Sequence, residues 1–255
     1  MSEAVQTSLR TAAKGTVLVF IGMVTSQLLW FVTKLLIVGN LSIEDLGVYS
    51  LTVTIASIVA LVATVGLCEG STRYISILLG QGKKEEAESA IRSSLMIGAI
   101  TGAASCVVMF FSSESLSRYV FYKPEISVPL RVMAFFVPAD VMASILAAIL
   151  RGYGIIRPRV YFMDIGQPLV FLLLLCPIFF FGLSFVHVIY AYVTSMVVMC
   201  ILVALYGQAN AGIKLLPLPV ERERGYVPKL LQFSLPVLSM QAMSLIFRSA
   251  DTLML

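Results

Sequence analysis

The residues best suited to chemistry in this sequence are a few ionisable side chains that interrupt long apolar segments. Lys34, Asp140, Arg248 and Asp251 each lie inside such a segment. A charge in hydrocarbon is costly, so residues of this kind usually face a watery cavity or a partner of opposite charge. They predict a binding site for ions or polar molecules inside a helix bundle, rather than covalent chemistry.

Three of these four charges also have a ready structural interpretation. Lys34 lies in the outer half of its segment and can extend its ammonium group to the headgroups. Arg248 and Asp251 are three residues apart on one helix face and can pair with each other. Asp140 is central in its segment, two residues after Pro138, and has no evident partner, so a cavity-lining role is favoured for it.

Catalytic and metal-binding motifs do not appear in the sequence. His187 is its one histidine, and there is no G-x-S-x-G, Walker or H-E-x-x-H pattern. The four cysteines form no C-x-x-C pair and suit helix packing. We therefore expect a protein that is not an enzyme and that needs no cofactor or metal.

The composition is that of a membrane protein. Hydrophobic residues make up 59% of the 255 residues and charged residues 13%, with a mean hydropathy of +0.95. Soluble domains have about half apolar and a quarter charged residues. The net charge of +4 is spread over many short loops, so nucleic acid is not an expected partner.

Seven segments are long and apolar enough to cross a bilayer as helices, and strand-like alternation is absent. The expected fold is therefore all-α, a polytopic membrane helix bundle. Gly98 and Gly102 in the third segment form a G-x-x-x-G pair, and Gly80–Arg92 is expected to form a glycine-rich turn and a short cytoplasmic helix that leads into it. The segments are Gly15–Val38, Leu46–Leu67, Ser93–Phe111, Val132–Leu150, Ile165–Phe181, Val186–Tyr206 and Leu231–Leu255.

The distribution of Lys and Arg predicts the orientation. Thirteen of them lie in the N-terminal segment and in the second, fourth and sixth loops, against three in the loops of the other side. Cytoplasmic loops carry such an excess, so the N-terminus is expected in the cytoplasm of a multi-pass protein of the cell membrane. Arg131 flanks the outer end of the fourth segment.

Four stretches together resemble Wzx-type polysaccharide flippases, in their order and spacing. The first contains Gly47 and Tyr49 after a short loop, and the last is similar to the seventh helix of that family. The stretches are Lys14–Leu51, Gly66–Ser76, Ile149–Arg159 and Phe233–Leu255. These flippases belong to the multidrug/oligosaccharidyl-lipid/polysaccharide exporter (MOP) superfamily.

The resemblance implies a MATE-like architecture of two six-helix lobes around a cavity that opens alternately to either side. Residues 1–212 would be the N-terminal lobe, 213–230 a cytoplasmic linker and 231–255 the first helix of a second, truncated lobe. The function would be the flipping of a lipid-linked oligosaccharide or polysaccharide precursor across the cytoplasmic membrane, with membrane lipids around it.

The implied substrate carries an anionic pyrophosphate, which needs a polar, cationic path through the bilayer. On this hypothesis Lys34, Arg248 and Arg131 attract the anion. Asp140 is the candidate site for a coupling proton or Na⁺. Other residues expected along the cavity are Asp251, Gln27 and Gln241, with Thr25, Asn40 and Ser244 as further polar contacts.

Other functions stay open at this stage. A cation-coupled multidrug exporter or a lipid II flippase would belong to the same superfamily. A membrane-embedded enzyme of cell-surface glycan synthesis would need a large loop with carboxylates or a metal motif, which the sequence lacks. A non-transporting scaffold would pair its buried charges and contain no cavity.

Overall fold

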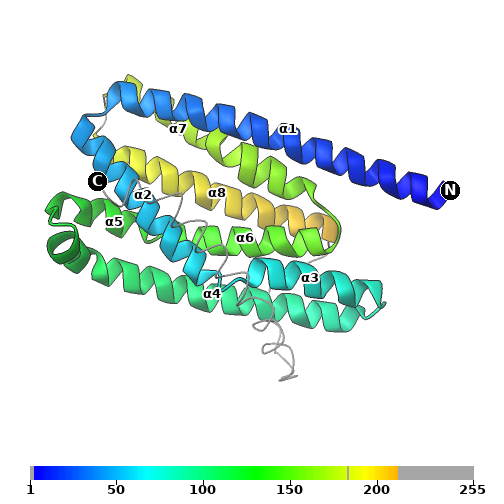
Figure 1. The fold of residues 1–255 in the computed structure, drawn as a ribbon. Coiled ribbons are helices and arrows are strands. Elements are labelled where there is room, and N and C mark those ends of the chain that lie inside the picture. Colours follow the sequence, from blue (N-terminus) through cyan, green and yellow to red (C-terminus); the bar gives the residue numbers. More distant parts are fainter. Residues whose placement is uncertain (1–2, 183, 212–255) are drawn as a thin grey trace.

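The computed structural model describes residues 3–182 and 184–211, and their regular structure is helical throughout (Figure 1). Six continuous helical stretches in this part are long and apolar enough to cross a membrane, which confirms an all-α polytopic bundle. The elements are α1 (Glu3–Asn40), α2 (Ile43–Ala63), α3 (Leu67–Gly80), α4 (Lys84–Ser115), η1 (Leu116–Val120), η2 (Pro124–Ile126), α5 (Ser127–Met133), α6 (Phe136–Gly152), η3 (Arg159–Gly166), α7 (Gln167–Phe180) and α8 (Phe185–Ala211).

One loop assignment from the sequence was wrong. Residues 68–80, assigned to the second loop, form most of α3, which extends the second span. The helix expected within Gly80–Arg92 is confirmed, because after a turn at 81–82 the helix α4 begins at Lys84 and continues into the third span. The charges in both stretches lower the local hydropathy, yet Leu67, Ile75 and Leu78 bury an apolar face of α3 at helical spacing.

A left-handed step separates α2 from α3. Val65 and Gly66 have φ angles of 47° and 67°. This region suits glycine, whereas a β-branched residue is strained in it. The Thr64 hydroxyl donates to the carbonyl of Leu61 at 2.6 Å and so satisfies one of the acceptors freed where α2 ends.

Prolines account for the breaks in the fourth and fifth spans. Pro138 has no amide hydrogen to donate to the carbonyl of Ala134, and the chain turns at 134–135 between α5 and α6. Pro168 likewise follows the π-helical segment η3 and lies in the first turn of α7. Both breaks lie near the polar residues described below.

The fourth span lies at the centre of the bundle. From Ile145 to Leu150 every residue of α6 is buried, and α6 packs against α3, α4 and α8. On the opposite side α1 packs against η3 and α7 and contacts α2 only slightly. Figure 1 shows α1 along one edge of the bundle and α3 and α4 along the other. Among residues 3–182 and 184–211, the helices α1 and α2 therefore pack only loosely against each other.

The small-residue pair of the third span forms a helix contact. A Cβ added at Gly102 would lie 3.2 Å from the Cα of Pro138, and one added at Gly98 would meet the side chain of Ile145. Small residues let two helices approach closely within a membrane. The G-x-x-x-G pair thus holds α4 against α6, the helix that carries Asp140.

We expect Gly102→Ala to destabilise the bundle by about 1–3 kcal/mol, the usual range for overpacking, since the backbone of Pro138 cannot rotate away. The measurement is thermal unfolding in detergent. Gly47→Ala is the matched control, because nothing lies within 4 Å of a Cβ at Gly47. Equal melting temperatures for the two variants would contradict the contact.

Candidate functional site

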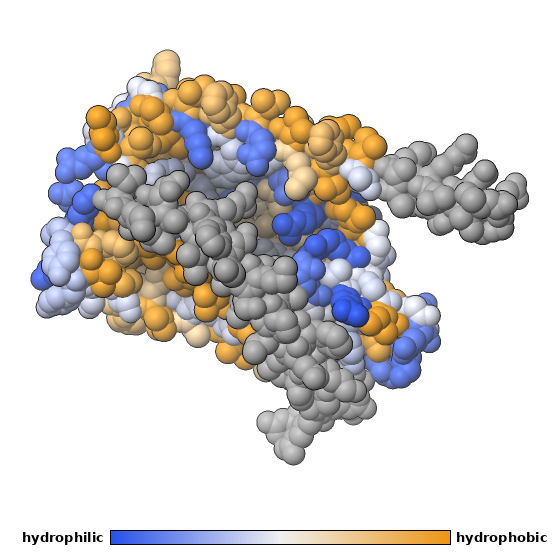
Figure 2. Space-filling view, viewed as in Figure 1, coloured by the Kyte–Doolittle hydropathy of each residue, from blue (hydrophilic) through white to orange (hydrophobic). Residues whose placement is uncertain are grey.

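A polar cavity of about 500 Å³ opens within the helices. Its walls come from the second, fourth, fifth and sixth spans. Figure 2 shows a hollowed face between the apolar edge along α1 and the opposite edge of α2 and α3, with hydrophilic residues gathered near the α3 end. The cavity is lined by Ser57, Leu61, Thr64, Cys68, Glu69, Phe136, Asp140, Ser144, Arg151, Arg159, Gln167 and Tyr192.

The α6 helix contributes one continuous stripe to this lining. Phe136, Asp140, Ser144 and Arg151 follow one another at spacings of four, four and seven residues, which places them on one helix face. The neighbouring faces of α6 bury apolar residues such as Val141 and Ile145. The helix is therefore apolar toward the bundle and polar toward the cavity.

Asp140 lies half-buried in the middle of the stripe. The positive charge of Arg159, at the start of η3, acts on its carboxylate. Ser144 lies one turn further along α6, and Gln167 and Tyr192 face the same cavity from α7 and α8. The carboxylate thus has one cationic neighbour and several neutral polar neighbours, an environment that can hold a proton or a small cation.

Aromatic rings fix the wall opposite the polar stripe. The ring of Tyr192 lies 5.2 Å from that of Phe171 and 5.3 Å from that of Phe136, centroid to centroid. Trp30 and Tyr49 approach it at 6.2 and 6.4 Å. Gln167 faces the same cavity as Tyr192. The cluster holds the Tyr192 hydroxyl beside the cavity and connects α1, α2, α6 and α7 to α8.

The other end of the cavity is basic and is held by close packing of α3 on α6. The hydroxyls of Thr72 and Ser76 donate to the carbonyls of Ala148 and Gly152 at 2.9 and 3.0 Å. These bonds position Arg151, whose Nη2 lies 3.4 Å from Oε1 of Glu69.

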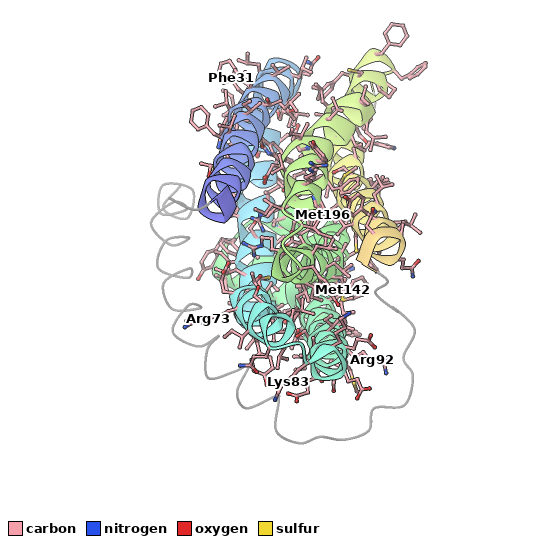
Figure 3. All side chains as sticks on the ribbon, turned by 90° about the vertical axis from the view of Figure 1, so that its right-hand side faces the viewer. Phe31, Arg73, Lys83, Arg92, Met142 and Met196 are labelled. Carbon is pink, nitrogen blue, oxygen red and sulfur yellow. The ribbon has the colours of Figure 1, made fainter. Side chains whose placement is uncertain are left out.

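Further cations surround this end of the bundle. Figure 3, viewed toward it, shows Arg73, Lys83 and Arg92 on the outer surfaces of α3 and α4. Lys83 forms an ion pair with Glu86 at 2.9 Å. The cavity therefore ends within a basic surface.

The sequence profile of the MatE family matches residues 19–178, more than half of the chain. The chain belongs to the MatE family. MatE proteins are transporters and not enzymes, in agreement with the expectation from the sequence. No curated protein matches the chain.

Solved MATE structures share the fold. A MOP superfamily transporter from Pyrococcus furiosus, described as having a binding pocket of reverse polarity, is 24% identical with a TM-score of 0.73 over 91% of this chain and 53% of that one. A MATE in complex with MaD5 is 23% identical with a TM-score of 0.75. The match covers 89% of this chain and 52% of that one.

An outward-facing multidrug resistance MATE transporter is 23% identical with a TM-score of 0.72. The match covers 91% of this chain and 53% of that transporter. The chain thus spans about half the length of these transporters. These likenesses show that the described helices have the fold of one MATE-like lobe.

Of the charges singled out in the MatE sequence, Asp140 lines the cavity. Lys34 and Gln27 are exposed and lie outside that lining. They share a helix face with Trp30, which lies between them at spacings of three and four residues and contacts Tyr192. Lys34 and Gln27 are therefore exposed on the face of α1 that also carries Trp30.

The structure places Arg131 away from Asp140. It lies on α5 and forms an ion pair with Glu114 at 3.0 Å, while its Nε donates to the hydroxyl of Ser113 at 3.1 Å. Arg118 pairs with the same glutamate at 2.8 Å. This cluster joins α4 to α5 at the end of the bundle opposite the basic one. Gln241, Ser244, Arg248 and Asp251 lie outside the described residues, as do the linker 213–230 and the helix 231–255.

The sequence interpretation missed most of the cavity lining. Arg151 and Arg159 were counted only as orientation signals, and Gln167 and Tyr192 were not considered. Spacing from Asp140 along α6 points to Phe136 and Ser144, at four residues either way. Nothing in the sequence places Tyr192 or Gln167 opposite Asp140, because their positions depend on how α7 and α8 pack.

We expect Ser57→Cys and Ser144→Cys to react with a membrane-impermeant maleimide roughly tenfold faster than Val107→Cys, because a thiol reacts as the thiolate, which forms where water reaches it. Val107 is exposed on an apolar surface of α4 and serves as the lipid-facing control. The background lacks the four native cysteines. Equal labelling rates for the three variants would show that the cavity is dry.

Proposed function

We propose that this chain is the N-terminal lobe of a MOP superfamily exporter that moves its substrate across the cell membrane by alternating access. The observation that carries the proposal is a polar, charged cavity opening within an apolar six-span bundle. Ionisable groups at this depth are costly unless water or a ligand reaches them. A non-transporting scaffold would fill the space with apolar side chains.

The substrate that we propose is a lipid-linked oligosaccharide or polysaccharide precursor. Two acidic and two basic residues share the cavity, together with serine hydroxyls, the Gln167 amide and the Tyr192 hydroxyl. Uncharged donors and acceptors suit sugar hydroxyls, and the arginines suit the phosphate groups of a lipid-linked saccharide. Lys34 and Gln27, which are exposed on α1, would guide the anion into the cavity.

The remaining parts of the proposal concern the second lobe and the orientation. Arg248, Asp251 and Gln241 would approach the cavity from the helix 231–255. The basic end would face the cytoplasm, where lipid-linked precursors are loaded, with the N-terminus on the same side. Membrane lipids would cover the apolar outer surfaces, including exposed Phe31 and Leu35 of α1.

Asp140 is the proposed coupling site for a proton or Na⁺. Its carboxylate is central in the fourth span and faces the cavity, with Ser144 and Gln167 able to supply neutral oxygen ligands. Carboxylate and carbonyl oxygens are the usual ligands of hard cations. Binding of a cation there would change the charge of the cavity during the transport cycle.

The substrate is tested with the full-length transporter in proteoliposomes that contain a fluorescent lipid-linked oligosaccharide. We expect the transporter to flip this lipid. We expect Lys34→Ala to reduce the rate of flipping while leaving the protein folded, since α1 loses an exposed cation that would attract the substrate. Lys123→Ala is the control, because Lys123 is exposed just before η2 and does not line the cavity. Absence of flipping by the intact transporter would exclude this substrate.

The coupling site is tested by Asp140→Asn, which keeps the shape of the side chain and removes its charge. We expect flipping driven by an imposed proton or Na⁺ gradient to fall by on the order of tenfold, the usual scale of coupling between two sites. Asp45→Asn is the matched control, since Asp45 lies in the first turn of α2, where its carboxylate accepts a hydrogen bond from the hydroxyl of the N-cap residue Ser42. Gradient-driven flipping that is unchanged in Asp140→Asn would exclude Asp140.

A cation-coupled multidrug exporter is the second candidate. It is favoured by the family match and by similarity to multidrug resistance MATE structures. The two arginines in the cavity oppose it, because a cationic drug would meet repulsion there. Export of a cationic dye by the same proteoliposomes, without flipping of the lipid-linked saccharide, would establish this alternative.

A further inference from the structure

Two arginines from different elements converge on one end of the cavity. Arg151 lies in the last turn of α6 and Arg159 begins η3. Both line the cavity, as does Cys68 of α3. Seven residues separate the two arginines in the sequence, and the turn between α6 and η3 brings both side chains to the same cavity.

Arg151 has hydrogen-bonding capacity to spare. Its one ion pair among the described residues, with Glu69, is long at 3.4 Å. Its Nε is buried and has no hydrogen-bond partner there. A guanidinium carries five N–H donors in a planar fork, and a buried donor left unpaired is costly. The donor geometry suits a planar or tetrahedral oxyanion that brings several acceptor oxygens.

Arg159 likewise lacks a close counter-charge in the described part of the chain. Its charge acts on Asp140 and on Asp164, yet no described carboxylate oxygen lies within 4.0 Å of it. Arg118 and Arg131 at the opposite end, in contrast, pair closely with Glu114. Arg118 and Arg131 are thus closely paired, whereas Arg151 has only the 3.4 Å pair with Glu69 and Arg159 has no ion pair among the described residues.

We propose that Arg151 and Arg159 together form a binding site for a diphosphate group. Two guanidinium groups on separate elements fit a ligand with two linked phosphates better than a single carboxylate, because each can hold one phosphate through two N–H donors. Glu69 holds Arg151 while the site is empty and releases it to the ligand. The inference rests on the proposed function, in which the diphosphate joins the lipid to the saccharide.

Cys68 provides a native reporter for this site. In the full-length transporter with Cys68 as its only cysteine, the rate of reaction with a negatively charged methanethiosulfonate is measured in detergent. The probes are inorganic pyrophosphate, a short isoprenyl diphosphate and phosphatidylglycerol. We expect pyrophosphate and the isoprenyl diphosphate to slow the labelling of Cys68 at least fivefold, and phosphatidylglycerol to leave it unchanged.

Substitutions decide which residues are responsible. Arg151→Gln and Arg159→Gln should each weaken protection by pyrophosphate roughly tenfold or more, the scale of a lost charged hydrogen bond. Arg157→Gln is the matched control, because Arg157 is exposed at the same end and does not line the cavity. A loss of protection that is equal in all three variants would overturn the proposal, since it would reflect only the net charge of this end.

Other outcomes are equally decisive. Protection that survives in both cavity variants would exclude these arginines. Equal protection by phosphatidylglycerol would show a membrane headgroup site instead. If the Cys68 thiol does not react in any variant, calorimetric titration with pyrophosphate replaces the labelling, with the same tenfold criterion and the same Arg157→Gln control.

The flipping assay separates this inference from the proposed function. Flipping of the lipid-linked saccharide that is unaffected by Arg151→Gln and Arg159→Gln would remove the diphosphate site and leave the function standing. Protection by pyrophosphate without any flipping of the saccharide would remove the proposed function and leave the diphosphate site standing. The arginine site would then serve a diphosphate of another kind.

Discussion

The cost of an ionised group in hydrocarbon is the constraint on which this structure depends. A lobe made almost entirely of apolar side chains keeps Asp140, Arg151 and Arg159 at or near membrane depth only because they face a common cavity. The fourth span shows this most clearly. One face of α6 is packed by apolar residues against α3, α4 and α8, and the other carries the polar stripe from Asp140 to Arg151. The close contact of Gly102 with Pro138 fixes the orientation of that stripe.

Irregular backbone occurs where it borders the cavity. Thr64, next to the left-handed step at Val65 and Gly66, is a lining residue, and so is Arg159 at the start of the π-helical η3. Broken helices are tolerated at membrane depth where the freed backbone groups meet protein or water. The step at Val65 is strained for a β-branched residue, and strain of this kind tends to gather at functional sites.

Much of the fold followed from hydropathy and charge, whereas little of the site did. Six apolar segments predicted the described spans, because crossing hydrocarbon requires about 20 apolar residues whatever the tertiary contacts are. The ends of the spans were missed where charged residues such as Lys84 and Glu85 lie on an exposed helix surface. Asp140 was identified because its cost in the membrane is visible from sequence. Tyr192 and Gln167 were missed because their role arises from packing between spans far apart in sequence.

The arrangement of charges links the two proposed ligands. Asp140 and Arg159 act on one another across the cavity, so each partly satisfies the other while no ligand is bound. A proton or cation on Asp140 would cancel its negative charge and leave Arg159 free to attract an anion. A diphosphate on Arg159 would, by the same electrostatics, weaken its hold on Asp140 and favour the cation there. Such coupling is reciprocal by thermodynamic necessity. A single pair of opposite charges in one lobe is thus sufficient for cation binding and anion binding to favour each other, without a contact between the two ligands.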